Sequence, residues 1–367
     1  MSIWLGFIGV LIVYLCVVVY LTIITRKWLL PNASKKQKVI YIVITNLFLN
    51  SFIIGMLVQS SVVRAIGSYG MAILYILFIT VPILHIIVML LRFSRISRKI
   101  VEQWAGRITL AFIVVIMCYG TFNAYSPVVH TYDISIEGKQ GQAEPLNIVM
   151  AADMHFGVLS EKNHAKRMVE KINKLNPDLV LYPGDIVDDN TEVFVKQDMA
   201  DILSEVQSTY GVYASLGNHD KGDIPDLIQE LEKSGMNVLY DEMTLINDAF
   251  TLVGRKDKTE SERASLQELL GNVDQTKPII LLDHQPYELD IAQEAGIDLM
   301  VSGHTHHGQL APFQFITDRI YENDWGHLQK EQFHSVVTSG FGFWGPPIRT
   351  SSRSEIIQIN VTFVETE

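Results

Sequence analysis

The sequence is poor in cysteine, with only Cys16 and Cys118 among its 367 residues. Both lie inside long apolar runs, so the chain after residue 125 contains none. This excludes a disulfide framework and a thiolate metal site there. A metal bound in that part must be held by His, Asp, Glu or Asn side chains.

Acidic residues are scarce in the first part of the chain. Residues 1–125 hold 11 Lys and Arg against the single acid Glu102, a net charge of +10, whereas the other 18 basic and 39 acidic residues give the remainder −21. This asymmetry indicates two regions in two physical environments. No nucleic-acid partner is expected, because nucleic-acid binding depends on basic patches.

Four long apolar runs account for a mean hydropathy of +0.21. They cover residues 3–25, 39–59, 70–91 and about 108–124. A bilayer crossing takes roughly 20 apolar residues, so four transmembrane helices are predicted in residues 1–125, with buried helices of a soluble protein as the weaker alternative. The N-terminus lacks a basic segment and a small-residue cleavage site, which favours a retained helix over a signal peptide.

The basic residues concentrate in the segments after the first and third runs, "RKWLLPNASKKQK" and "RFSRISRKIVEQWAGR". Positively charged loops stay in the cytoplasm. The prediction is therefore a multi-pass cell-membrane protein whose N-terminus and second domain lie outside the cytoplasm. A polar linker is predicted at 126–145 and the domain at 146–367.

Short apolar runs alternate with amphipathic stretches in this domain. The runs are "LNIVMAA", "DLVLYP", "GVYASL", "FTLVG", "PIILL" and "IDLMVS", and the helical stretches cover 160–175, 191–208 and 224–234. Runs rich in Val, Ile and Leu without strict alternation are typical of strands buried on both faces. The predicted fold class is α/β, with helices covering the sheet.

Metal-capable side chains directly follow five of these six runs. Ligands in α/β proteins bind outside the carboxyl ends of the strands, so one site is expected from Asp153, His155, Asp185, Asn218, His219, His284, His304 and His306. These donors exceed what one divalent ion needs. Two ions sharing a carboxylate would use them, as in phosphate ester cleavage. Nitrogen and oxygen donors without thiolate favour Mn, Fe or Zn.

The same residues carry a family resemblance. The ordered series Asp153-x-His155, Gly184-Asp185-x-x-Asp188, Gly217-Asn218-His219-Asp220, His284 and Gly303-His304-x-His306 resembles the motifs of the calcineurin-like metallophosphoesterase family. The resemblance covers about residues 146–362, and "GHTHHGQ" is similar to the "GHTHGGQ" loop of its membrane-associated bacterial branch. It implies a four-layer α/β/β/α sandwich, here preceded by the four transmembrane helices.

The resemblance also implies a role for each residue. Asp153, His155 and His306 would bind one metal, and Asn218, His284 and His304 the other, with Asp185 bridging them. His219 would act on the leaving group, as a general acid or a phosphate-stabilising cation, and Asp188 would orient it. His307 departs from the pattern, because the similar branch usually has Gly there. A role for His307 outside the ligand set is favoured over metal or phosphate contact.

The predicted function is hydrolysis of a phosphomonoester or phosphodiester by a membrane-anchored two-metal enzyme outside the cytoplasm. Four spans exceed what tethering requires, which favours a phospholipid or lipid-linked phosphate over a water-soluble nucleotide or sugar phosphate. The alternative is a non-catalytic membrane sensor or assembly factor that retains a metal-binding domain. A transporter with an accessory domain is weaker, because the spans hold no carboxylate well inside them.

Overall fold

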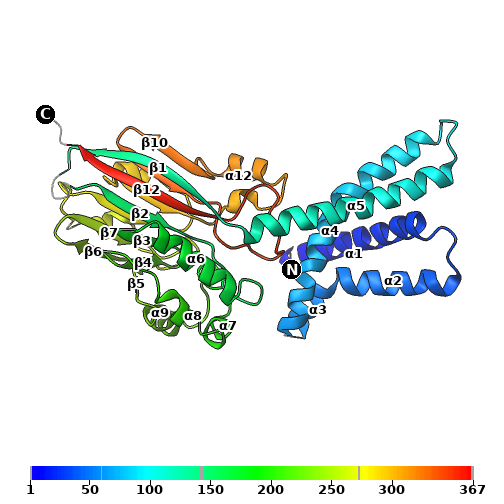
Figure 1. The fold of residues 1–367 in the computed structure, drawn as a ribbon, viewed down its shortest axis with the longest axis horizontal. Coiled ribbons are helices and arrows are strands. Elements are labelled where there is room, and N and C mark those ends of the chain that lie inside the picture. The colour runs from blue at the N-terminus through cyan, green and yellow to red at the C-terminus, as the bar shows by residue number, and fades with distance from the viewer. Residues whose placement is uncertain (1, 59, 140–143, 272, 365–367) are drawn as a thin grey trace. The chain divides into compact units, whose positions relative to one another are not determined.

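The computed structural model describes residues 2–58, 60–139, 144–271 and 273–364. Its contacts divide the chain into two compact units (Figure 1). The first comprises Met1–Thr121 with Gly345–Ile348, and the second comprises Phe122–Trp344 with Arg349–Glu367. The sharp change in net charge and hydropathy along the sequence falls close to the division at residue 121.

The first unit is built from helices. They are α1 (Ser2–Leu29), α2 (Lys35–Leu49), α3 (Ser51–Leu57), α4 (Ser61–Leu91) and most of α5 (Arg98–Tyr125). Three segments are long and apolar enough to cross a membrane, namely Ile8–Leu29, Ser61–Leu91 and Arg98–Tyr125. The predicted second span, 39–59, corresponds to α2 and α3, which are bent by 57° at their junction, and its last residue lies outside the described residues. Three spans are therefore found, or four if the bent pair counts as one.

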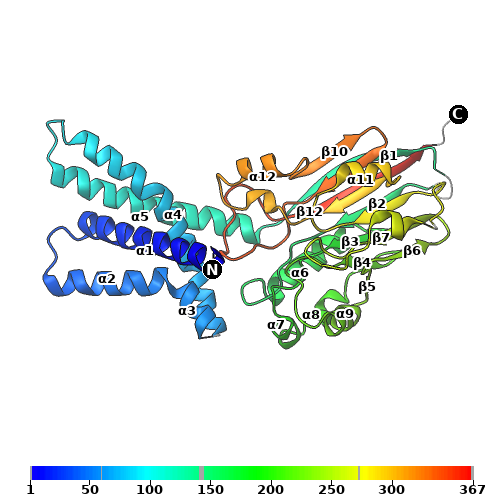
Figure 2. The ribbon, with the colours of Figure 1, turned by 180° about the vertical axis from the view of Figure 1, so that it is seen from behind.

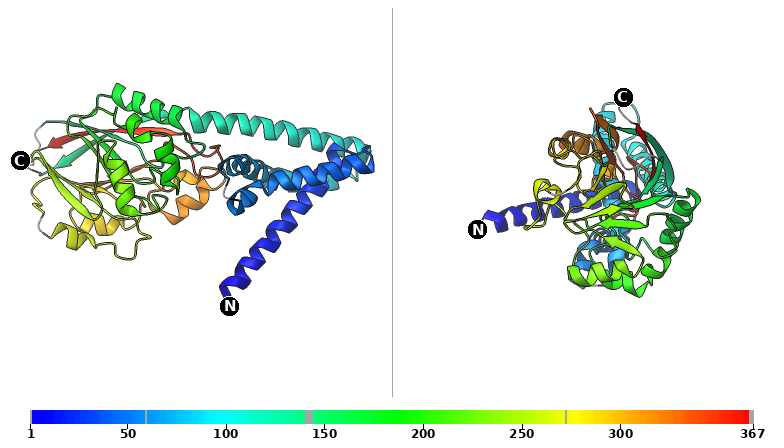
Figure 3. Two further views of the ribbon diagram at one scale, coloured as in Figure 1. Left: turned by 90° about the horizontal axis from the view of Figure 1, so that it is seen from below. Right: turned by 90° about the vertical axis from the view of Figure 1, so that its left-hand side faces the viewer.

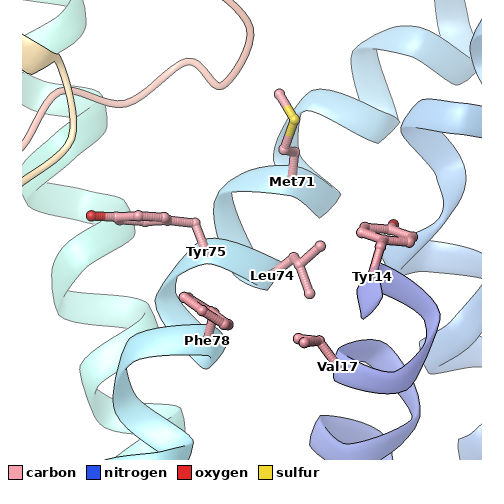
Figure 4. Close-up of a pocket in the computed structure, with 6 residues that line it drawn as sticks. All are labelled: Tyr14, Val17, Met71, Leu74, Tyr75 and Phe78. Atoms are coloured by element: carbon pink, nitrogen blue, oxygen red, sulfur yellow. The ribbon is translucent and has the colours of Figure 1, made fainter. Parts of the chain in front are cut away.

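Apolar side chains on these helices face outward more often than inward. Only 22% of the most apolar window of each candidate span is buried, and Leu57 and Val62 are 79% and 69% exposed. Such surfaces suit hydrocarbon rather than water. An open hollow of about 280 Å³ between α1 and α4 is lined by Tyr14, Val17, Met71, Leu74, Tyr75 and Phe78 (Figure 4). These six side chains carry no charge and hold no ligand set for catalysis.

Two six-stranded sheets form the centre of the second unit. The first has the order β1 (Val128–Glu137), β12 (Glu355–Val364), β2 (Leu146–Met150), β3 (Leu179–Pro183), β4 (Val212–Ser215) and β5 (Met236–Val238). The second has the order β10 (Gly326–Lys330), β11 (Phe333–Val337), β9 (Leu299–Ser302), β8 (Ile279–Leu282), β7 (Phe250–Gly254) and β6 (Glu242–Ile246). The pairs β2–β3–β4 and β7–β8–β9 are parallel, so within each group the carboxyl ends share one edge.

Three hydrophobic cores hold the layers together. The middle core joins the inner faces of the two sheets, with Ile148 and Leu181 from the first and Leu282 and Val301 from the second. Another core packs α6 (Lys162–Lys174), α8 (Met199–Leu203) and α9 (Ile224–Glu232) on the first sheet. A third packs α10 (Leu266–Leu270) and α11 (Leu289–Glu294) on the second. The predicted four-layer α/β/β/α sandwich is confirmed, and its helices flank the strands in Figures 2 and 3.

The six predicted strands correspond to β2, β3, β4, β7, β8 and β9. The predicted helices at 160–175 and 224–234 correspond to α6 and α9. The predicted helix at 191–208 is wrong as a single element, because the chain forms α7 (Thr191–Lys196) and α8 with a break at Asp198. Asp198 has a left-handed backbone, with φ of 46°, and this conformation interrupts a right-handed helix.

The predicted linker at 126–145 requires a larger correction. Residues 128–137 form β1, which runs parallel to β12 along its whole length. Ile134 and Ile136 are buried in the core between the sheets, so this segment is part of the folded domain. Residues 140–143 of the predicted linker lie outside the described residues.

Candidate metal centre

Five loops at the carboxyl ends of the strands carry the predicted ligands. Asp153 and His155 follow β2, Asp185 follows β3, Asn218 and His219 follow β4, His284 follows β8, and His304 and His306 follow β9. Three groups of side chains in these loops have potential ligand atoms within 4.8 Å of one another: Asp153, His155 and His306; Asp185, His284 and His304; and His155, Asp188 and His219. The first group contains the three residues predicted for one metal, and the second joins His284 and His304 of the other predicted set to Asp185, the predicted bridge.

The first group is buried. His155 Nε2 lies 3.1 Å from His306 Nε2, and His306 Nε2 lies 3.4 Å from Asp153 Oδ1. Burial lowers the pKa of His155 to about 4, more strongly than the Asp185 carboxylate raises it. The pKa of His306 is also lowered, by burial and then by His155. Both imidazoles are therefore neutral at neutral pH, which is the form that binds metal.

The second group is oriented by the backbone. His284 Nδ1 donates a hydrogen bond to the carbonyl of Pro183 at 2.8 Å, so its Nε2 points to Asp185 Oδ2, 3.2 Å away. A hydrogen bond at one ring nitrogen fixes the orientation of a metal-binding imidazole. Burial opposes the charged form of His284, but Asp185 and Asp153 outweigh it and raise its pKa to about 10. The two carboxylates thus favour a positive charge between them, on the His284 ring or on a bound cation.

Asp185 lies between the two groups. Its Oδ2 is 3.2 Å from His284 Nε2 and 3.7 Å from His155 Nε2, while its Oδ1 accepts a hydrogen bond of 2.7 Å from the backbone N–H of His219. Burial alone would raise the pKa of Asp185, but the charge of His284 and its hydrogen bond to Asp185 hold that pKa below its usual range. An ionised carboxylate with one oxygen facing both groups is suited to bridge two cations.

The backbone at these ligands is strained. Asp153, His155, Asp185, His304 and His306 have φ of 52°, 44°, 54°, 72° and 49°, in the left-handed region that favours glycine. Each such residue costs on the order of 1 kcal/mol or more, and such strain clusters at functional sites. Five left-handed residues in the strand-end loops lower the stability of the fold, so their conformations indicate that these side chains are placed to bind a ligand.

Two glycines leave room for the carboxylates. A Cβ on Gly217 would lie 2.2 Å from Asp185 Oδ1, and a Cβ on Gly303 would lie 2.3 Å from Asp153 Oδ2. A larger residue at either position would displace a ligand. This explains why a glycine precedes both the "NHD" and the "HTHH" segments.

The donor atoms of the site fit divalent metal ions. Asn218 Oδ1 is buried and has no hydrogen-bond partner within the described part of the chain. A buried polar atom without a partner is costly, and a metal ion would satisfy Asn218 Oδ1. Carboxylate, amide oxygen and imidazole donors together suit first-row transition metals and zinc.

His219 has a different partner from the one predicted. Its Nδ1 lies 3.0 Å from Asp189 Oδ1, and Lys221 Nζ contacts the same oxygen at 2.8 Å. Asp189 thus holds His219 at Nδ1 in this structure, while Asp188, which was predicted to orient His219, has a carboxylate oxygen within 4.8 Å of ligand atoms of both His219 and His155. Burial lowers the pKa of His219, but the hydrogen bond to Asp189 and the charge of Asp185 raise it above the ordinary value overall.

The sequence model of the family described as calcineurin-like phosphoesterase matches residues 146–308, which contain all of these ligands. A metallophosphoesterase of Aquifex aeolicus is 30% identical over 262 residues, and the alignment covers 68% of this chain and 98% of that protein. The chain belongs to the calcineurin-like metallophosphoesterase family. Membership suggests a hydrolase that uses divalent metals.

One of the similar proteins is named as a transmembrane protein. The transmembrane protein with metallophosphoesterase domain of Danio rerio is 31% identical over 74% of this chain and 66% of that protein. A metallophosphoesterase of Campylobacter jejuni is 29% identical over 69% of each chain. The chain thus spans about two thirds of these two relatives. The apolar helices and the similarity to a transmembrane protein together indicate that this metallophosphoesterase is a membrane protein.

His307, the residue that departs from the family pattern, faces away from both ligand groups. Its Nδ1 lies 3.0 Å from Asp324 Oδ2, and its ring packs on Trp325 with 5.0 Å between centroids. Its φ of 44° explains why glycine is usual at this position in the similar branch. The interpretation that His307 is not a metal ligand agrees with this geometry.

We expect a His307→Gly variant to keep its full metal content. Glycine relieves about 1 kcal/mol of backbone strain, and the lost hydrogen bond to Asp324 costs about as much. Thermal stability should therefore change little. Metal analysis and thermal unfolding check this, with His306→Ala as the matched control that should lose metal. A large loss of metal from His307→Gly would contradict the interpretation.

Arg349 supports the metal loops by hydrogen bonds to their backbone carbonyls. This residue was not singled out from the sequence. Its side chain is fully buried. The guanidinium donates to the carbonyls of Ser339, Gly340 and Gly342, and to the carbonyl of His306 at 3.4 Å. It thus ties the loop after β11 to a metal ligand.

Replacing Arg349 by methionine is expected to destabilise the domain by about 3 kcal/mol or more, because several buried carbonyls lose a charged donor. Arg349→Lys should not rescue it, since a single ammonium cannot reproduce the planar guanidinium. The thermal unfolding midpoint in detergent measures this. Arg319→Met, at an exposed position, is the control that should leave the midpoint unchanged. An unchanged midpoint for Arg349→Met would show that the carbonyls find other donors.

Proposed function

We propose that this chain is a membrane-anchored two-metal phosphoesterase whose site hydrolyses a phosphomonoester or phosphodiester. The observation that carries the proposal is the pair of ligand groups on either side of Asp185, at 3.2 Å from His284 and 3.7 Å from His155. A single buried ion would need only one group. The full ligand set speaks against a non-catalytic sensor, which would have no need to keep it.

A pair of divalent ions bound there supplies Lewis-acid polarisation of phosphoryl oxygens and acidification of water. The residues of the chain supply the rest. Asp189 accepts a hydrogen bond from Nδ1–H of His219 and thereby leaves Nε2 of that ring to face the leaving group. A protonated His219 can give its proton to the departing oxygen. The half-exposed Trp344 ring, 5.9 Å from the His219 ring, forms one wall beside this position.

The decisive experiment measures metal and turnover together. Purified full-length protein should contain two transition-metal or zinc ions per chain, lose hydrolysis when a chelator removes them, and recover it when one metal is returned. A screen of monoesters against diesters then assigns the reaction class. Protein that binds two ions and hydrolyses neither class would overturn the proposal and support the sensor.

We further propose that the domain acts outside the cytoplasm. The support is the basic character of the two segments after the first and third apolar runs, together with an even number of crossings if α2 and α3 form one span. A C-terminal fusion to a reporter that is active only in the cytoplasm tests this side. Activity of that reporter would place the domain in the cytoplasm.

The proposed substrate is a phospholipid or a lipid-linked phosphate, and a water-soluble phosphate ester is the alternative. The support is the short connection between the last span and the domain, since only residues 126 and 127 separate α5 from β1. Rates on a phosphate ester in lipid micelles and on a soluble ester of similar leaving group distinguish the two. Equal rates would remove the support for a lipid substrate.

A further inference from the structure

One helix of the second unit has an apolar surface that the domain leaves open. The seven residues of α12 (Gln314–Ile320) are all described, and none of them is buried. Phe315, Ile316 and Ile320 are 64%, 51% and 55% exposed. A helix this short is marginal in water, and helices are usually stabilised by burying an apolar face. Exposed apolar patches mark contact with a partner or a membrane.

The start of α12 is tied to the segment 349–354. The backbone N–H of Ala311 donates to Thr350 Oγ1 at 2.9 Å, and the N–H of Thr350 donates to the carbonyl of Gln309 at 2.8 Å. Gln309 in turn follows the ligand His306 by three residues. The helix is therefore attached both to the metal loop and to segment 349–354.

The last turn of α5, which belongs to the same unit, is attached to that segment as well. Asn123 Nδ2 donates to the carbonyl of Arg349 at 3.1 Å, and the N–H of Ser354 donates to the carbonyl of Asn123 at 3.0 Å. Arg353 Nε bonds to the carbonyl of Ser126 at 2.6 Å. The end of the membrane-spanning helix α5 and the start of α12 are thus both hydrogen-bonded to the same segment, 349–354.

We propose that α12 lies in the surface of the bilayer, with Phe315, Ile316 and Ile320 among the lipid headgroups and upper acyl chains, so that the metal centre opens at the membrane surface. The two residues between α5 and β1 reach at most about 7 Å, so this part of the domain stays close to the bilayer. Apolar helix faces bury in this way at interfaces. The net charge of −21 beyond residue 125 would repel anionic lipids, so the docking is apolar. The docking of α12 on the bilayer does not require that the metal centre hydrolyse a phosphate ester.

The test uses full-length protein in which Cys16 and Cys118 are replaced by alanine, reconstituted into phosphatidylcholine vesicles. A single cysteine replaces Ile316 and carries an environment-sensitive fluorophore. The matched control places the cysteine at Ile291 on α11 instead. Ile291 is also an isoleucine and is 50% exposed, compared with 51% for Ile316. Phospholipids with brominated acyl chains then quench any fluorophore that enters the bilayer.

The fluorophore at 316 should lose most of its emission to the brominated lipid, and the one at 291 should not. Adding Phe315→Asp and Ile320→Asp should restore the emission, and adding anionic lipid should not increase the quenching. Absence of quenching at 316 would overturn the proposal. So would a blue-shifted emission without quenching, which would mean that protein, such as a second copy of the chain, covers α12. Equal quenching at both positions would also overturn it.

Discussion

An Asp185→Asn protein is expected to lose at least one of the two proposed ions and to turn over about 10³-fold more slowly or worse. Asp185 Oδ2 faces His284 and His155, one from each ligand group. Asparagine keeps the size of the side chain and can still accept the hydrogen bond from the backbone of His219. The change therefore removes the bridging charge while it spares the loop. Metal analysis and steady-state hydrolysis measure the two losses.

Asp298→Asn is the matched control for this experiment. Asp298 is also buried, and it also accepts a backbone hydrogen bond, 2.8 Å from the N–H of Ile279, but it belongs to none of the ligand groups. It should keep both ions and full turnover. Gly217→Ala offers an independent route to the same loss, because its Cβ would displace Asp185 Oδ1. If Asp185→Asn kept both ions and its activity, Asp185 could not be the bridge.

The layout of the site was predictable because local sequence determines it. Five of the six predicted strands end in a metal-capable segment, and parallel strands bring those ends to one edge. Strand positions and residue types therefore sufficed to predict that these side chains meet in one site, whereas their division into two ligand sets came from the family resemblance. The six central strands were found for the same reason, since a short run of Val, Ile and Leu gives a strong signal.

The edge of the first sheet was not predictable in the same way. The first part of β1 alternates half-buried and exposed residues, and it contains His130, Thr131 and Asp133, which resemble a polar connection. Its partner β12 lies 227 residues further along the chain, with Val128 opposite Glu355. Such a pairing depends on the closure of the whole domain, which no local window of sequence contains.

No role was predicted from the sequence for Asp189 or for Arg349, for related reasons. Asp188 and Asp189 are adjacent carboxylates, and the turn that gives Asp189 a φ of 55° decides which of them reaches His219. Arg349 resembles any surface arginine in sequence, and it becomes buried only because carbonyls of the loop after β11 converge on it. The position of Arg349 in "PPIRTSS", among small and turn-forming residues, is the only signal that could have marked it.

Replacing His219 by alanine is expected to spare both ions and to slow turnover by about 10²–10⁴-fold, the range that general acid–base catalysis contributes. The backbone N–H of His219, which bonds to Asp185, is unchanged by the substitution. Metal retention also decides between roles, because His155, Asp188 and His219 form a third group of potential ligands. Loss of an ion from His219→Ala would make His219 a ligand instead of an acid.

The leaving group distinguishes the two catalytic roles that remain for His219. A nitrophenyl ester releases a weakly basic oxygen that needs no proton, whereas an alkyl ester releases a strongly basic one. If His219 is the general acid, His219→Ala should slow the alkyl ester far more than the nitrophenyl ester, and Asp189→Asn should show a weaker form of the same pattern. If His219 instead stabilises phosphate charge as a cation, both esters should slow equally, because the phosphoryl group is the same in each.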